Sequence, residues 1–403
     1  MKLVKMSLVA AMVMGASAFA IDNVKISGDA KLFYGTDDQG TAGLLDKASS
    51  YADTAVRLGA TGDLAKGISF GVTANAVSTL GLENNLVANT WTGAHNAAVE
   101  DHMWVSEAWM AATMGKTTAK VGRMALDTPL AFSETWSVAA NTFDAAVLIN
   151  QDLPDTTLVG AWVGKSNGVD AANASASAAD RDGIMRDGAA FGDFALEGAY
   201  AAAIVNNSFK PLVAQAWYYN VVDVADAYWL QADWDCQLVK NVKVGVQYAN
   251  MSPKGTGIVV AGTANDSSAY AVKVAFAGVK NLNVSAAYSD ADKDGGLKIQ
   301  NVAASGQSKL YTESYWSYGF VGAPDATSMN LTAEYTAEDI AKFGAYYTSV
   351  NNGAAASAGD LDELALTATK SFGPLDATLA YINTEANAVS SYNTVQAYLT
   401  LNF

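Results

Sequence analysis

Cysteine and histidine are nearly absent from this chain of 403 residues. The single cysteine, Cys236, excludes a disulfide framework and any metal site that needs several cysteines. The only two histidines, His95 and His102, exclude a histidine-rich metal centre. A hydrolase site also needs a nucleophile with a base in reach, and these two histidines are the only imidazoles that could serve as that base. The sequence therefore predicts that the protein is not an enzyme.

Basic residues and long apolar runs are scarce as well. There are 24 Lys and Arg against 40 Asp and Glu, and the formal charge of −16 argues against nucleic-acid binding, which needs a basic surface. Beyond residue 20 no run of about 18 apolar residues occurs, so no transmembrane helix is expected. Yet 51% of the chain is hydrophobic and only 16% is charged. This composition suits two or three soluble domains or one large closed barrel.

Residues 1–20 have the features of a secretory signal peptide. Two lysines precede a short apolar stretch at 6–14, and segment 18–20 reads Ala-Phe-Ala, which supplies the small residues of a cleavage site. We expect cleavage before Ile21; an uncleaved anchor helix is the alternative. An exported chain this apolar is either a β-rich secreted protein or an outer-membrane barrel.

The hydrophobic period that recurs is two, as in β-strands, rather than the 3.6 of helices. Apolar and polar residues alternate over 394–403, and again over 242–248, 282–288 and 375–381. Runs of about ten residues with one apolar face match the length of a tilted strand that crosses a bilayer. The pattern predicts membrane-spanning strands.

The composition of the two faces distinguishes a barrel from a soluble sandwich. The polar face carries Gly, Ala, Ser, Thr, Asn and single charges, and Trp and Tyr rim the apolar face. This suits a wet lumen and a lipid exterior with aromatic girdles, whereas a sandwich packs its apolar face inside. A soluble protein of two sheets remains the alternative.

Short and long links alternate along the chain, which predicts an up-and-down topology. Short links are expected at 62–67, 115–116, 152–155, 206–211, 239–241, 278–281, 337–340 and 372–374. Longer ones are expected at 35–51, 79–101, 125–141, 167–188, 220–226, 251–267, 290–326, 350–360 and 385–390. The count gives about eighteen strands, the even number that bacterial barrels have. We expect residues 21–403 to form one all-β domain, a transmembrane antiparallel barrel in the outer membrane of a Gram-negative bacterium, in contact with its lipid.

The chain ends in an alternating strand closed by Phe403. Chain ends are usually polar and frayed, so a terminal aromatic residue is unusual. It is the feature that the barrel-assembly machinery of outer membranes recognises, and we expect that machinery to be a partner.

Several segments resemble the Campylobacter-type major outer membrane porin family, which is related to the porin D group. Residues 121–123 (Val-Gly-Arg), 127–130 (Asp-Thr-Pro-Leu) and 141–144 (Asn-Thr-Phe-Asp) resemble its third loop and flanking strands. Residues 156–163 resemble the next strand, and the first five residues and Phe403 also fit. The resemblance implies an eighteen-stranded homotrimeric porin whose third loop folds inward to narrow the pore. The chain departs from substrate-specific porins in having only four arginines, so a basic ladder for carboxylate substrates is not expected.

A porin needs an eyelet where charged side chains face each other across water. Segment 125–141 is acidic and lacks basic residues, and alternation points three charged residues of neighbouring strands inward. The predicted constriction comprises Asp127, Glu134, Asp144, Arg57, Glu107, Lys120 and Arg123. Asp127 and Glu134 could instead hold the loop to the wall, and Arg123 breaks the inward phase of its strand.

One further motif concerns metal. Asp290, Asp292 and Asp294, followed by Gly295, reproduce the start of a calcium-binding loop, in which oxygens two residues apart converge on one ion. The twelfth position is Asn301 rather than the usual glutamate. A calcium site and a solvated acidic loop tip both remain open, and no cofactor is required.

The function that these patterns predict is a general diffusion porin, a passive channel for ions and small hydrophilic solutes. Eighteen strands enclose a lumen too wide for side chains to fill. The acidic balance predicts modest cation selectivity, because a low-dielectric wall focuses the field onto the water path. A structural or adhesive barrel without transport is the alternative.

Overall fold

The computed structural model describes residues 22–82, 86–88, 101–136, 138–167, 191–195, 197–254, 265–303, 306–353, 359–386 and 389–403. The predicted signal peptide, residues 1–20, lies outside these ranges. Within them, no helix is long and apolar enough to cross a membrane.

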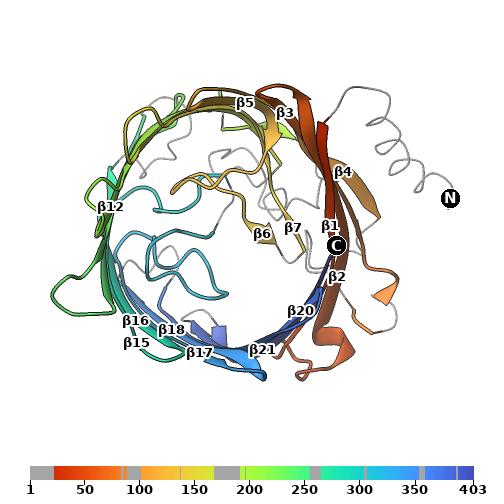
Figure 1. Ribbon diagram of the computed structural model, residues 1–403. Helices are drawn as coiled ribbons and strands as arrows, with labels where there is room; N and C mark the ends of the chain where they lie inside the picture. Colours follow the sequence, from red (N-terminus) through yellow and green to blue (C-terminus); the bar gives the residue numbers. More distant parts are fainter. Residues whose placement is uncertain are drawn as a thin grey trace.

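The strands form a ring, and the β6–β7 hairpin lies inside it (Figure 1). Their bounds are β1 (Asp22–Asp37), β2 (Ser50–Ala65), β3 (Ile68–Ser78), β4 (His102–Met114), β5 (Thr117–Met124), β6 (Thr135–Trp136), β7 (Ala139–Ala140), β8 (Phe143–Asn150), β9 (Thr156–Ser166), β10 (Gly192–Asp193), β11 (Ala199–Asn206), β12 (Leu212–Val221), β13 (Ala225–Asp235), β14 (Val242–Pro253), β15 (Ser267–Val279), β16 (Leu282–Ala291), β17 (Ala326–Ala337), β18 (Ala341–Asn352), β19 (Leu361–Phe372), β20 (Leu375–Ala386) and β21 (Val389–Asn402). A 3₁₀ turn, η1 (Lys47–Ser49), precedes β2.

The barrel is closed and antiparallel. Nineteen strands share one sheet, of which β10 is a two-residue addition to β9, and β6 and β7 form a separate hairpin. The remaining eighteen pair in chain order, and β1 pairs with β21 to close the ring. The predicted eighteen-stranded antiparallel barrel is confirmed.

Link lengths follow the sequence prediction except at two of the predicted longer links. At 385–390 the link is short, because β20 ends at Ala386 and β21 begins at Val389. All eight predicted short links join neighbouring strands at one end of the barrel. The segment 220–226, predicted as a longer link, is instead a tight turn, because β12 runs to Val221 and β13 starts at Ala225. Asp223 adopts a φ of 56° there, a left-handed conformation that a short polar side chain tolerates. Polar composition alone did not reveal the turn.

The outer face of the barrel is apolar and uncovered. Val121 and Leu379 are 59% and 60% exposed, whereas the adjacent lumen-facing residues include the charged Lys120 and the buried Ala380. Tyr218, Tyr228 and Tyr270 stand on the same outer face toward the end that carries the long links. An apolar band edged by tyrosines is typical of a barrel surface in contact with lipid. Exposure of so large an apolar surface to water would be unfavourable.

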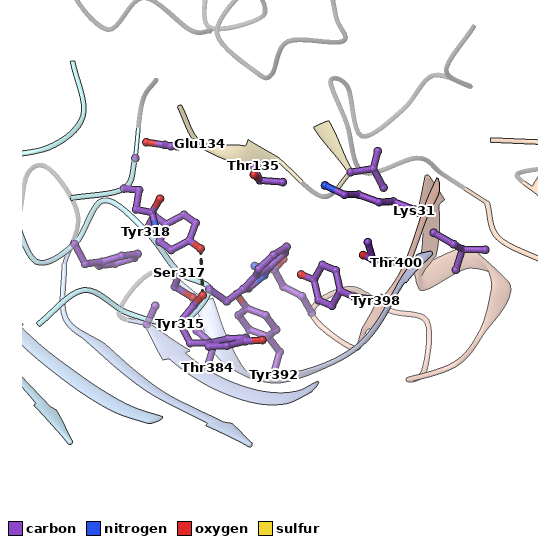
Figure 2. Close-up of a pocket in the computed structure, with 18 of the residues that line it drawn as sticks. Lys31, Glu134, Thr135, Tyr315, Ser317, Tyr318, Thr384, Tyr392, Tyr398 and Thr400 are labelled. Atoms are coloured by element: carbon purple, nitrogen blue, oxygen red, sulfur yellow. Dashed lines mark hydrogen bonds between the residues drawn. The ribbon is translucent and has the colours of Figure 1, made fainter. Parts of the chain in front are cut away.

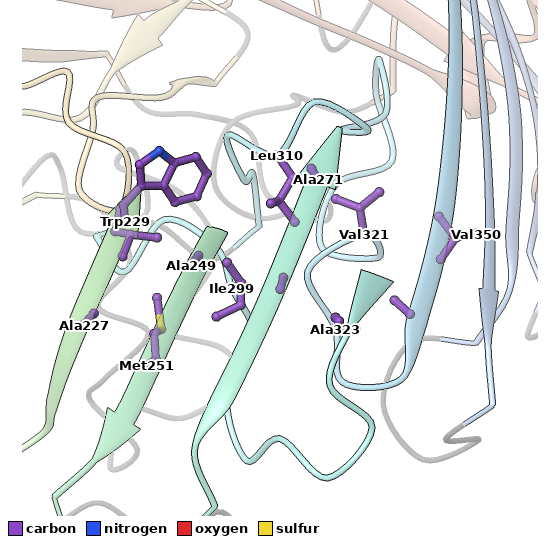
Figure 3. Close-up of a cluster of buried hydrophobic side chains, with 14 of the residues drawn as sticks. Ala227, Trp229, Ala249, Met251, Ala271, Ile299, Leu310, Val321, Ala323 and Val350 are labelled. Atoms are coloured by element: carbon purple, nitrogen blue, oxygen red, sulfur yellow. The ribbon is translucent and has the colours of Figure 1, made fainter. Parts of the chain in front are cut away.

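The inner face is not wet throughout, contrary to the prediction. On β13 to β15, lumen-facing positions hold alanines that are fully buried, among them Ala227, Ala249 and Ala271. These small residues leave room for Ile299 and Leu310 from the link between β16 and β17 (Figure 3). Burying each such side chain stabilises the link by about 1.5–3 kcal/mol. One side of the lumen is therefore a packed core.

The seam between the first and last strands depends on a glycine. Gly28 and Phe403 exchange two backbone hydrogen bonds of 2.8 and 3.0 Å. A Cβ atom on Gly28 would lie 2.5 Å from the Arg57 carbonyl oxygen and 2.6 Å from the Phe403 ring. The terminal ring thus occupies the space that the glycine leaves open.

Candidate functional site

Two links turn inward from the same end of the barrel and cross the lumen. The first, residues 125–142, carries the β6–β7 hairpin into the ring (Figure 1). The second, residues 292–325, packs against the alanine-lined wall described above. The inward third loop was expected, and the inward fold of the second link was not.

The two inward links are bonded to each other through Asn301. Its Nδ2 donates to the Phe132 carbonyl and to Glu134 Oε1, both at 2.8 Å. Its Oδ1 accepts from the Phe132 backbone N–H at 3.1 Å. The backbone N–H of Val302 also donates to the Leu130 carbonyl at 2.9 Å. The links therefore form one assembly.

The second link is also bound to the wall through Glu363 on β19, a lumen-facing residue that is 1% exposed. Its carboxylate accepts the backbone N–H groups of Tyr315, Trp316 and Ser317 at 2.8, 3.0 and 2.8 Å. Hydrogen bonds to an ionised acceptor are stronger than neutral ones. The carboxylate thereby fixes the link at one point of the wall.

A cavity of about 750 Å³ lies between this assembly and the wall of β1, β20 and β21. Figure 2 shows Lys31 and Glu134 on opposite sides of it, with aromatic side chains along its floor. The aromatic residues that line it are Tyr315, Trp316, Tyr318, Phe320, Tyr392 and Tyr398. Thr135, Thr384 and Thr400 add hydroxyl groups. The cavity therefore has a basic and an acidic residue on its two sides, and we refer to it as the eyelet cavity.

The predicted wall residues carry charges of both signs. Arg57 lies opposite Asp29 in the β1–β2 register, and its Nη2 is 2.6 Å from the carboxylate. Lys120 stands 4.0 Å from the centre of the Trp109 ring, and both share the lumen-facing phase with Glu107. A cation over an aromatic face is electrostatically favourable.

Arg123 and Asp144 are brought together by the structure, but at the wall. Arg123 Nε donates to Asp144 Oδ1 at 2.8 Å, and its Nη1 donates to the Val105 carbonyl at 2.9 Å. These bonds join β4 and β8 at the point where the chain leaves β5 for the lumen. Neither residue lines the eyelet cavity.

The two predicted loop acids differ in exposure. The Asp127 side chain is 88% exposed and pairs with Lys309 of the second inward link. Glu134 is 5% exposed. Burial raises the pKa of Glu134 to about 7, although hydrogen bonds from Asn301 and Gln307 favour its ionised form. Glu134 therefore holds the links together, and Asp127 presents its charge to water.

Four residues of this region were missed as site residues. Lys31 shares the inward phase of Asp29 on β1, so alternation could have identified it. Glu363 likewise lies in the lumen-facing phase of its strand, whereas Lys309 and Glu313 lie on the second link, which has no periodic pattern. Burial raises the pKa of Glu313 to about 7 as well, although Ser308 and Ser314 donate to it.

The three aspartates of the predicted calcium loop do not converge. Asp290 accepts from Thr327 at 3.1 Å, and Asp292 accepts from the backbone N–H of Asp294 at 3.0 Å. Lys293 lies in the same hollow. Across the described ranges, no three His, Cys, Asp or Glu side chains are grouped to hold a metal ion. Calcium binding stays a prediction, and the present geometry does not fit it.

Comparison with solved structures finds similar barrels. This chain aligns with the outer membrane protein opdK of Pseudomonas aeruginosa at a TM-score of 0.74 and 13% identity, over 94% of this chain and 98% of that one. OccK8 (OprE) of the same organism aligns at a TM-score of 0.71 and 15% identity, over 94% of this chain and 98% of that one. OccK3 (OpdO), also from Pseudomonas aeruginosa, aligns at a TM-score of 0.70 and 16% identity, over 94% of this chain and 96% of that one. At these identities the likeness establishes the fold.

No curated protein matches the sequence. The profile of the Gram-negative porin family matches residues 7–401, almost the whole chain. That family consists of channel proteins of the outer membrane rather than enzymes, in agreement with the closed barrel and its apolar belt. The chain belongs to the Gram-negative porin family.

Proposed function

We propose that this porin is a passive, water-filled channel for ions and small hydrophilic solutes, with a modest preference for cations. The observation that carries the proposal is the eyelet cavity, which places charged groups across a space bounded by the inward links and the wall. Such a space sorts solutes by size and local field. Its narrowing by two bonded links favours small solutes over large ones.

The cation preference rests on the distribution of charge. The chain carries 40 acidic and 24 basic residues, and the apolar outer belt leaves most of them to the lumen and the links. Lys31, Arg57 and Lys120 on the wall oppose this excess, so the preference is modest. Salt weakens it, because the Debye length falls from about 10 Å at 0.1 M to about 3 Å at 1 M.

Two finer assignments complete the proposal. The resemblance of residues 121–144 to the Campylobacter-type porins supports a third loop that narrows the pore. The same resemblance supports a homotrimer, which cross-linking in mild detergent tests; a protein that stays monomeric overturns this assignment.

The experiment that tests the channel is single-channel recording in a planar bilayer. Stepwise conductance with a cation-favouring reversal potential in a KCl gradient is expected. A protein that inserts as a folded barrel and gives no current steps would instead be the structural or adhesive barrel.

A further inference from the structure

The aromatic floor of the eyelet cavity is fixed by contacts outside it. The Tyr398 ring packs on Phe33 with centroids 4.7 Å apart, and Phe33 packs on Trp316 at 6.2 Å. Tyr315 stacks on Tyr346 at 5.3 Å. Because the rings are already held in place, a solute loses little binding energy to their ordering. The floor is a preorganised surface.

One end of the cavity carries a cation that retains capacity for an anion. The closest Asp29 oxygen is 3.9 Å from Lys31 Nζ, and the other oxygen of Asp29 is held by Arg57 at 2.6 Å. The Lys31 side chain is 25% exposed and lines the cavity. An ammonium group has three donors, and a carboxylate is its strongest partner.

The other end carries an acidic side chain. Glu134 and Tyr318 lie there, away from Lys31 (Figure 2). Burial, and then the charges of Glu313, Glu134 and Glu363, raise the pKa of the Tyr318 hydroxyl. Glutamates from three elements therefore lie near this ring, and they carry negative charge when they are ionised. Lys298, which donates to the Gly319 carbonyl at 2.8 Å, offsets part of that charge. Ring faces backed by negative charge attract organic ammonium groups.

We propose that this cavity is a binding subsite for small zwitterions, with the solute carboxylate on Lys31 and its organic ammonium group on the ring faces of Trp316, Tyr318 and Tyr398. The proposal rests on the channel function proposed above. A solute that is charged at a single end binds one end of the cavity and leaves the other end without a charged partner. Unlike charges at the two ends thus select for zwitterions.

The test uses three solutes of nearly equal shape, added to single channels in a planar bilayer. Glycine betaine carries both charges, choline lacks the carboxylate, and tert-butylacetate replaces the ammonium group by a neutral one. Binding is read as concentration-dependent interruption of the potassium current. Glycine betaine should bind at least about tenfold more tightly than either analogue, since each loses one charge-assisted contact.

Variants assign the two ends. Lys31→Met should weaken the binding of glycine betaine about tenfold and leave the binding of choline unchanged. Trp316→Leu should weaken the binding of both and leave the binding of tert-butylacetate unchanged. The matched control is Lys243→Met, which removes another lumen-facing lysine, one that pairs with Asp235 at 3.0 Å outside this cavity. Equal binding of the three solutes by a conducting channel overturns the subsite alone. A protein that folds and does not conduct overturns the channel function instead.

Discussion

Glu363 on β19 accepts the backbone N–H of Trp316 at 3.0 Å, which ties the middle of the second inward link to the barrel wall. The same carboxylate also accepts from Tyr315 and Ser317. A strand residue thus holds the second inward link, in addition to the packing of the link's own side chains. Its anchoring can be tested separately from the fold.

Glu363→Gln removes the charge that three N–H groups share. Hydrogen bonds to charged groups contribute about 1.5–3 kcal/mol each, so the anchoring should weaken by at least about 2 kcal/mol. We expect larger and noisier open-channel currents. Asp362→Asn is the matched control, because Asp362 faces outward and accepts only from Tyr347 among the bonds described for it. Equal currents from both variants would show that the contact of Glu363 with the link does not determine the width of the pore.

Asn301→Asp should separate the two inward links. The substitution turns the amide that donates to Glu134 and to the Phe132 carbonyl into an acceptor facing acceptors. Leaving such groups unsatisfied costs about 1–3 kcal/mol each. Conductance should rise, and it should rise more than in Asn301→Ser, which can still donate. The reverse order would contradict the role of this amide.

Conductance should depend on pH through Glu134 and Glu313. Both have a pKa raised to about 7 in the folded links, against 4.5 ordinarily, so the assembled links bind more protons than separated ones. Their contribution to the stability of the assembled links is complete below about pH 4.5 and is lost as the pH rises through about 7. We expect smaller, quieter currents at about pH 5 than at about pH 8. The double variant Glu134→Gln, Glu313→Gln should flatten this dependence, and an undiminished dependence would place the sensor elsewhere.

Ion selectivity should respond to Asp127 more than to Glu134. Asp127 is largely exposed and offsets the positive charge of Lys309, whereas Glu134 is buried and partly protonated near neutral pH. Asp127→Asn should therefore shift the reversal potential in a KCl gradient toward anions, and Glu134→Gln should shift it less. Asp376→Asn, at the opposite end of the barrel, serves as the control. A larger effect of Glu134→Gln would be inconsistent with its burial.

Gly28→Val should weaken the closing seam of the barrel. Its Cβ atom would meet the Arg57 carbonyl oxygen, which belongs to the backbone and cannot move aside. Overpacking of this kind costs about 1–3 kcal/mol. The heat-modifiable band in electrophoresis should shift to lower temperature. Ala30→Val, on the same outer face two residues along, should leave the transition unchanged.

The strands could be predicted because their signal is local. Alternation in β14, β16, β20 and β21, together with the short turns, gave the barrel and its strand number directly. The tight turn at Asp223 escaped because its polar neighbours resemble a longer link. Local patterns therefore determine the wall.

The inward assembly depends on contacts between distant residues, which a local pattern does not contain. The second link packs on Ala227, Ala249 and Ala271, and these alanines form a hollow only after the barrel closes. Likewise, the burial of Glu134 depends on Asn301, 167 positions away. Exposed Asp127 and buried Glu134 look alike in the sequence.

The most direct test of the central claim, a water path bounded by Lys31 and the inward links, is chemical access to single positions. In a Cys236→Ser background, Lys31→Cys and Ala30→Cys place a thiol on opposite faces of β1. A charged, water-soluble thiol reagent should reduce the current through the Lys31→Cys channel and leave the Ala30→Cys channel unaffected. Equal effects on both channels, or none on Lys31→Cys, would contradict this account of the pore.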